Sequence, residues 1–401
     1  MTEWKKATLD EMGVVSRGRS KHRPRNDAKL FGGKYPFIQT GDIGAAGLYV
    51  VEYSQTYNEE GLAQSKLWEK DTLCITIAAN IADTALLAFP ACFPDSIMGF
   101  IPFENVSNVK FVKYCFDILK NDCQQISQGT AQDNLSWKKL STILFPCPQI
   151  YVQNRIADIL SRYDSLIENY QRQIKLLEEA AQRLYKEWFV VLRFPGHETT
   201  PIINDIPDGW QKKKLADVVD LRSGYAFKSS TFVDKGRYKL VTIKNVKDGF
   251  FDGDNVSYLE SIPEKMPLHC VLNTGDILLS LTGNVGRVCM VTGNDYLLNQ
   301  RVAKLKSSIP AFAYCLFRSH DMFIAINNLA NGAAQQNVSP IKIGELNVVV
   351  ADDETINKFE LLCGKIINRI LKLHTQICHL SEARDRLLPK LMNGEIIKIF
   401  D

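Results

Sequence analysis

The chain has 401 residues, of which 45% are hydrophobic and 23% charged, and its formal net charge is +3. This length can hold two or three domains, each with its own core, and the mild charge neither demands nor excludes a nucleic-acid partner. The N-terminal segment is too polar for a signal peptide, and no apolar run approaches the roughly 18 residues of a membrane span. We therefore expect a cytoplasmic protein without membrane contact.

The ten cysteines include no C-x-x-C pair, and the six histidines form no H-x-H or H-E-x-x-H cluster. Scattered cysteines of this kind are typical of reduced core residues in a cytosolic protein. The sequence therefore predicts neither a metal site nor a cofactor.

Residues 1–150 mix short apolar runs with turn residues and predict a first globular domain. Segment 35–44 reads as a strand that runs into a turn, and segment 72–80 as a buried strand. Pro146 and Pro148 are expected to end regular structure before the following helix.

From residue 151 to residue 192 the apolar residues recur in steps of three and four, which predicts a long helix with one apolar stripe. The stripe comprises Ile156, Ile159, Tyr163, Leu166, Tyr170, Leu177, Leu184 and Trp188, with Ile174 and Ala181 filling the gaps. This segment carries equal numbers of acidic and basic residues, so we interpret it as a helical spacer with a protein partner rather than a DNA-binding rod.

Residues 193–209 are rich in proline, glycine and small polar residues and are interpreted as a linker. A second globular domain is predicted over residues 210–353, with strand-like segments at 240–246 and 276–286. Residues 354–401 form a distal helical spacer and C-terminal tail. The stripe of that helix comprises Phe359, Leu362, Ile366, Ile370, Leu373, Ile377, Leu380 and Leu387.

The two halves repeat each other. Segment 129–136, GTAQDNLS, returns as GAAQQNVS at 332–339, and the helices that follow share the same offset, as in Leu177 and Leu380. Trp4 likewise matches Trp210. The expected fold is therefore α+β, with two similar mixed α/β domains separated by a long antiparallel two-helix coiled coil with pseudo-two-fold character. The alternative, in which each helix packs only on its own domain, stays open.

The sequence lacks the motifs of a DNA-modifying or nucleotide-using enzyme. It contains no phosphate-binding G-x-x-x-x-G-K-[ST] loop, no G-x-G-x-x-G after a strand, no [DN]-P-P-[YF] of an amino-methyltransferase and no G-x-S-x-G elbow. The repeated segments instead carry amides, hydroxyls and glycines. They favour a protein that reads a partner over a catalyst, and we expect no catalytic residues.

The strongest local charge lies in the first domain, where five cations occur within nine residues with no acid among them. Loops of this kind are suited to DNA phosphates, although a purely solvated loop is the alternative. The five predicted contacts are Arg17, Arg19, Lys21, Arg23 and Arg25.

Amide and basic side chains elsewhere supply further DNA-binding candidates, because amides bind base edges and cations bind phosphates. In the repeat, Gln132 and Gln335 are candidates, while Asn134 or Ser136 and Asn337 or Ser339 are open to a purely structural reading as turn or helix caps. The remaining candidates, each of which could also be an ordinary surface residue, are Lys228, Lys244, Asn245, Arg287, Asn299, Gln300 and Arg301.

The order of these sequence motifs and their repetition make the chain resemble the specificity subunit of type I restriction–modification systems over essentially its whole length. The resemblance rests on W-x-x-x-x-L at Trp4 and Trp210, LVTIKNV, GDILLSLTGNVG, the repeated GTAQDNLS/GAAQQNVS and the two helical regions that follow. The first domain departs from it in having AAN at 78–80, where the second has TGN.

The resemblance implies that each globular domain is a target recognition domain for one half of a bipartite, asymmetric sequence in double-stranded DNA. It implies that the helices dock two modification (methyltransferase) subunits, which bind S-adenosylmethionine and methylate adenine. Restriction (motor-nuclease) subunits would join through the complex, and this chain would be non-catalytic. The alternative from the residues is a free-standing, pseudo-dimeric DNA-binding regulator, which would bind its site without a methyltransferase.

Overall fold

The computed structural model describes residues 4–78, 80–127, 135–254, 256–330 and 337–396. The chain divides into two compact units. Unit 1 comprises residues 1–169 and 379–401, and unit 2 comprises residues 170–378. Within the described ranges no helix has the combination of length and apolar character that a membrane crossing needs.

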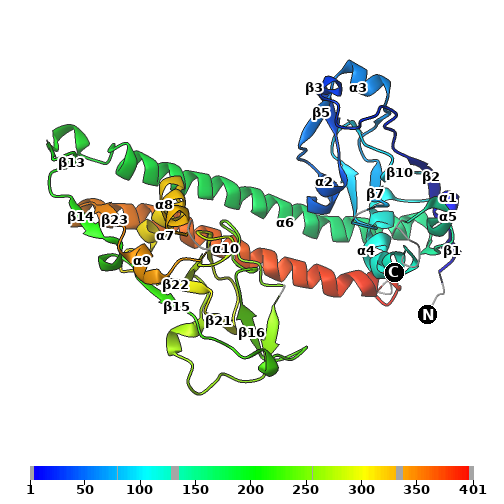
Figure 1. Cartoon of the computed structure of the whole chain (residues 1–401). Coiled ribbons are helices and arrows are strands. Elements are labelled where there is room, and N and C mark those ends of the chain that lie inside the picture. Colours follow the sequence, from blue (N-terminus) through cyan, green and yellow to red (C-terminus); the bar gives the residue numbers. More distant parts are fainter. Residues whose placement is uncertain (1–3, 79, 128–134, 255, 331–336, 397–401) are drawn as a thin grey trace. The chain divides into compact units, whose positions relative to one another are not determined.

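Unit 1 is built on two sheets and a long helix (Figure 1). The larger sheet has the strand order β2-β10-β7-β8-β4, comprising Gly13–Arg17, Ile97–Pro102, Leu73–Thr76, Thr84–Leu87 and Tyr49–Val50. The smaller sheet has the order β5-β3-β9-β6, comprising Gln55–Tyr57, Phe31–Phe37, Ala91–Cys92 and Leu67–Trp68. Helix α4 (Val109–Ser127) contacts β8 and β10, and the predicted buried strand at 72–80 is confirmed because all four residues of β7 are buried.

Short elements complete unit 1. Strand β1 (Lys6–Ala7) pairs antiparallel with β11 (Phe145–Pro146), so Pro146 lies in a strand and does not end regular structure there. A two-stranded pair tolerates proline because the strand has a free edge. The predicted turn after the strand at 35–44 is the short helix α2 (Thr40–Ala45). The other helices are α1 (Leu9–Met12), α3 (Glu59–Ala63) and α5 (Trp137–Leu140).

Unit 2 repeats this plan. Its larger sheet has the order β15-β22-β19-β20, comprising Asp220–Ser223, Val302–Lys306, Ile277–Ser280 and Val288–Met290. Its smaller sheet has the order β17-β16-β21-β18, comprising Ser257–Leu259, Tyr238–Val241, Tyr296–Leu298 and Val271–Leu272. Unit 2 also contains β14 (Gln211–Lys214), which pairs with β23 (Asn347–Val350), and the helices α7 (Pro310–Arg318), α8 (His320–Ala330) and α9 (Pro340–Gly344).

The repeat predicted from the sequence is therefore a repeat of topology. The central pair of each smaller sheet, β3/β9 and β16/β21, is parallel, and in each larger sheet the same antiparallel partners meet in the same order. Each unit also has separate apolar cores of its own. The α+β class with two similar domains is confirmed.

Two long helices follow the domains in sequence, α6 (Ile150–Tyr185), extended by a π-helical turn at Lys186–Val190, and α10 (Asp353–Met392). Within unit 2 they run antiparallel, because Gln173 contacts Arg369 while Tyr185 packs on Phe359 farther along. In unit 1, Asp164 of α6 contacts Arg384 of α10.

The phase of the predicted stripes is wrong at two positions. Leu166 is 39% exposed and Leu362 is 47% exposed, whereas their neighbours Ile167 and Cys363 are buried. In α6 and its π-helical extension the residues at 160, 167, 174, 181 and 188 are all buried, which is one residue per heptad. The apolar side of the helix therefore includes the residue beside each misplaced leucine.

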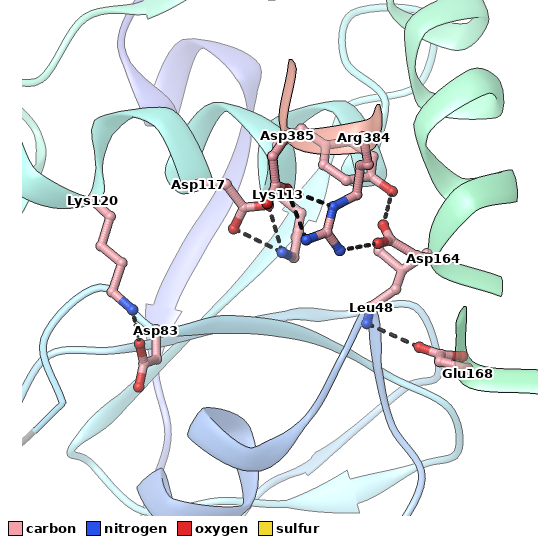
Figure 2. Close-up of polar contacts among 10 residues, drawn as sticks. Leu48, Asp83, Lys113, Asp117, Lys120, Asp164, Glu168, Arg384 and Asp385 are labelled. Atoms are coloured by element: carbon pink, nitrogen blue, oxygen red, sulfur yellow. Dashed lines mark hydrogen bonds and ion pairs between the residues drawn. The ribbon is translucent and has the colours of Figure 1, made fainter. Parts of the chain in front are cut away.

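A polar cluster ties three helices of unit 1 together (Figure 2). Asp164 accepts a hydrogen bond from Tyr114 of α4 at 2.5 Å and pairs with Arg384 at 2.6 Å. On α4, Lys113 pairs with Asp117 at 2.6 Å, and burial raises the pKa of Asp117. Because the Asp164 side chain is only 8% exposed, these bonds supply the partners that a buried carboxylate requires.

The predicted linker at 193–209 contains a hairpin. Strands β12 (Ile202–Ile203) and β13 (Ile206–Pro207) are joined through Asn204 and Asp205, both of which have positive φ. Asparagine and aspartate tolerate this left-handed conformation, which two-residue hairpin turns require. Eight of the ten cysteines are buried, as expected for core residues, whereas Cys147 is half-buried and Cys378 exposed.

Candidate nucleic-acid interface

Several backbone segments meet at one end of the larger sheet in each domain. In the second domain, Leu281 N–H donates to Arg301 O and Val338 N–H donates to Leu281 O, both at 3.0 Å. The first domain makes the same two bonds, at 3.0 and 2.9 Å, through Ile77, Ser96 and Leu135. Because main-chain bonds fix these loops to one another, side chains on them are held at defined positions.

The loop that leaves the first strand of each larger sheet joins the same place. Gly18 and Gly224 lie so close to the neighbouring backbone that an added Cβ would come within 2.3 Å of Pro94 O and Leu298 O respectively. Only glycine permits this approach. The basic loop of the first domain and the loop at 222–228 of the second, which carries Tyr225 and Phe227, therefore hold equivalent positions and present different side chains.

All five cations of the basic loop, Arg17 to Arg25, are exposed. Arg25 pairs with Asp95 at 2.7 Å, and Arg23 lies 3.9 Å from the same carboxylate. Among the residues that the structure describes, Arg17, Arg19 and Lys21 have no carboxylate within ion-pair distance. These three cations are the ones whose charge is available to an anionic partner.

In the second domain the meeting loops enclose a cavity of about 550 Å³. Its polar lining includes the predicted Gln300 and Arg301, both exposed, together with Thr282 and Asn337. Asn299 is half-buried, and its side chain accepts from Arg301 N–H at 3.3 Å, so it holds the turn that presents its neighbours.

The repeated segment ends in a helix cap in both domains. The hydroxyl of Ser136 accepts from Lys139 N–H at 3.4 Å, and that of Ser339 accepts from Lys342 N–H at 3.3 Å. The structural reading of these serines as N-caps is therefore confirmed. Gln132, Asn134 and Gln335 lie outside the described residues.

Asn245 is a correction to the predicted contacts. Its side chain is fully buried, its Oδ1 accepts from Thr242 N–H at 2.8 Å and its Nδ2 donates to Asp252 O at 2.8 Å. It therefore fastens a turn and cannot reach a base. Lys244 beside it and Lys228 are exposed.

Arg287 belongs to a loop that both domains build in the same way. Ser280 Oγ donates to Asn284 O and accepts from Arg287 N–H at 3.1 Å. The matching bonds in the first domain join Thr76, Asn80 and Asp83. Half-buried Arg287 thus corresponds to Asp83, which pairs with Lys120 at 2.5 Å (Figure 2). The two domains therefore place opposite charges at this position.

Sequence reasoning missed Thr282 as a cavity residue and left Asn337 open to a structural reading as a turn or helix cap. The available signal was the difference between AAN at 78–80 and TGN at 282–284, which falls in the loop that both domains share. The acidic partner of the basic loop, Asp95, is distant in sequence and carries no local signal.

Comparison with known proteins agrees with this architecture. The family described as "Type I restriction modification DNA specificity domain" matches residues 1–179 and 207–384. The chain belongs to this family. It therefore acts in DNA recognition within a type I restriction–modification system, as a non-catalytic specificity subunit.

Relatives match along nearly the whole chain. The type I restriction enzyme MjaIX specificity subunit of Methanocaldococcus jannaschii is 25% identical over 98% of this chain and 94% of that protein. The HindI specificity subunit of Haemophilus influenzae is 21% identical over 99% of this chain and all of that protein. The crystal structure of a type I S subunit from M. genitalium shares the fold, with a TM-score of 0.62 at 15% identity over 97% and 96% of the two chains.

Proposed function

We propose that the chain reads a bipartite, asymmetric DNA sequence, with residues 1–150 contacting one half and residues 210–353 the other. The observation that carries this proposal is the contrast between the two loop clusters. Their backbone bonds are the same, but the side chains they present differ, as at Asp83 and Arg287. A shared scaffold with different side chains suits two half-sites of unlike sequence.

Phosphate contacts supply affinity in this proposal. In the first domain they come from Arg17, Arg19 and Lys21, which no acid neutralises among the described residues. In the second domain they come from Lys228, Lys244, Arg287 and Arg301. Gln300 contributes a side chain able to bond a base edge.

The helical spacers, residues 151–192 and 354–401, dock two methyltransferase subunits in this proposal, and restriction subunits join through the complex. Both helices carry apolar side chains that a protein partner could bury. In unit 2, Leu176, Leu361 and Leu362 are 59%, 63% and 47% exposed. A chain that recognises DNA without catalysing a reaction requires a catalytic partner subunit if the DNA is to be methylated.

The test compares the purified chain with the complex formed by co-expression with the methyltransferase subunits of its host. We expect tight, sequence-specific DNA binding and adenine methylation from the complex only. Methyl transfer by the isolated chain would contradict the non-catalytic role. Tight binding of one DNA site by the isolated chain, unchanged by the methyltransferase, would instead support a free-standing regulator.

A further inference from the structure

A side-chain pair in the second domain joins two loops at the wall of the cavity. Thr282 Oγ1 donates to Asn337 Oδ1 at 3.3 Å, and the two residues also form an antiparallel backbone bridge. Arg301 and Gln300 line the same cavity from the neighbouring turn. Asn337 is exposed, and the bond to Thr282 is its one side-chain hydrogen bond within the described part of the chain.

The fold does not need this pair. Capping of α9 is done by Ser339, and the backbone register of the loops is held by Val338 N–H donating to Leu281 O at 3.0 Å. The first domain builds the same junction with Ala78 at the position of Thr282, and alanine has no hydroxyl to donate. Asn337 itself is matched by Asn134 in the repeat, so what differs between the two domains at this junction is the hydroxyl that orients the amide.

We propose that Asn337, oriented by Thr282, is a specificity-determining residue of the second domain and binds the major-groove edge of a purine. This inference rests on the proposed function and deepens it. The threonine hydroxyl occupies one lone pair of Oδ1 and so fixes which end of the amide is the acceptor. A second lone pair and both amide hydrogens remain free. That arrangement fits the N6–H and N7 of adenine, whereas a guanine offers acceptors only.

The test substitutes Asn337→Asp, which keeps the acceptor and the size of the side chain but removes both amide hydrogens. The target is first defined by mapping methylated adenines in a host that carries the wild-type chain with its methyltransferase. Binding of the complex is then measured on duplexes with each base pair of the target changed in turn. We expect N337D to weaken binding to the wild-type target by roughly 5- to 150-fold. The loss should disappear on duplexes changed at one purine of the half-site read by the second domain.

Two further variants separate orientation from contact. Thr282→Val should relax the preference at the same purine, and Thr282→Ser, which retains the hydroxyl, should preserve it. Asn347→Asp, the same chemical change at an exposed position of β23, should alter neither half-site. A wild-type melting temperature of the N337D chain in its complex shows that the variant is folded, and an unchanged base preference in the first half-site shows that the first domain still recognises DNA.

The outcomes distinguish this inference from the function on which it rests. If the wild-type complex methylates no two-part target, the proposed function fails. If the two-part target is present but N337D keeps every base preference, or weakens binding equally on all duplexes, Asn337 is not a specificity-determining residue and the proposed function stands.

Discussion

The basic loop of the first domain makes a quantitative prediction about salt dependence. Replacing Arg17, Arg19 and Lys21 by alanine removes the three loop cations that have no acidic partner among the described residues. Each phosphate contact contributes about 0.9 to the slope of log affinity against log salt, so the triple variant should lower that slope by about 2.7. Over a fourfold increase in salt, the wild type should therefore lose about 40-fold more affinity than the variant.

The structure also supplies an internal control within the same loop. Arg25 is neutralised by Asp95 at 2.7 Å, so Arg25→Ala should change the slope by much less than 0.9. Asp95→Asn should release that arginine and steepen the slope. The assay is fluorescence anisotropy of the complex on labelled target and non-target duplexes between about 50 and 200 mM salt, the range over which phosphate-dependent binding changes most visibly.

Phosphate contacts carry no sequence information, so the triple variant should lose affinity on target and non-target DNA alike. An unchanged slope would show that the loop is only solvated. An equal effect of Arg25→Ala and Arg19→Ala would show that the ion pair with Asp95 does not set which cations reach DNA.

Three stability predictions follow from packing and burial. Gly224→Ala should lower the melting temperature and the free energy of unfolding, the latter by about 1–3 kcal/mol, because the new Cβ meets backbone atoms. Gly41→Ala is the control, since no atom lies within 4 Å of its added Cβ. Equal effects of the two substitutions would refute the argument. Asp164→Asn should lower the free energy of unfolding in urea by about 2–3 kcal/mol. This loss is smaller than that for a fully buried pair, because the side chain of Arg384 is 30% exposed. An unchanged free energy of unfolding would contradict the pairing. Burial raises the pKa of Glu178 above its ordinary 4.5, so its contribution to stability is full below pH 4.5 and is lost as pH rises through the raised pKa. Glu178→Gln should therefore gain stability relative to the wild type over that pH range. Parallel curves of unfolding free energy against pH for the two proteins would contradict this.

Much of the fold could be predicted because it depends on local patterns. Strands β7 and β19 are buried apolar runs that each end in one hydroxyl residue, and both long helices begin one residue before the predicted starts at 151 and 354. The repeat was visible because its caps require the same residue types in both halves, as at Ser136 and Ser339. Which residue of each neighbouring apolar pair is buried in the long helices could not be predicted, because apolar steps of three and four fit either Leu166 or Ile167.

The candidate site was harder to predict because its contacts join distant parts of the chain. Asp95 lies 70 residues from Arg25, and Thr282 lies 55 residues from Asn337. Asn245 had the residue type of a base-reading side chain, but tertiary burial committed its amide to the backbone of its own turn. Residue type alone therefore identified the loops that meet at the sheet end but not which of their side chains are available.

The central claim is that each domain specifies one half of the target independently. The most direct measurement exchanges residues 1–150 for the corresponding region of a relative and maps methylated adenines in a host that carries the hybrid and the methyltransferase. The account predicts a new sequence in one half-site and the original sequence in the other. A change in both half-sites, or in neither, would contradict it.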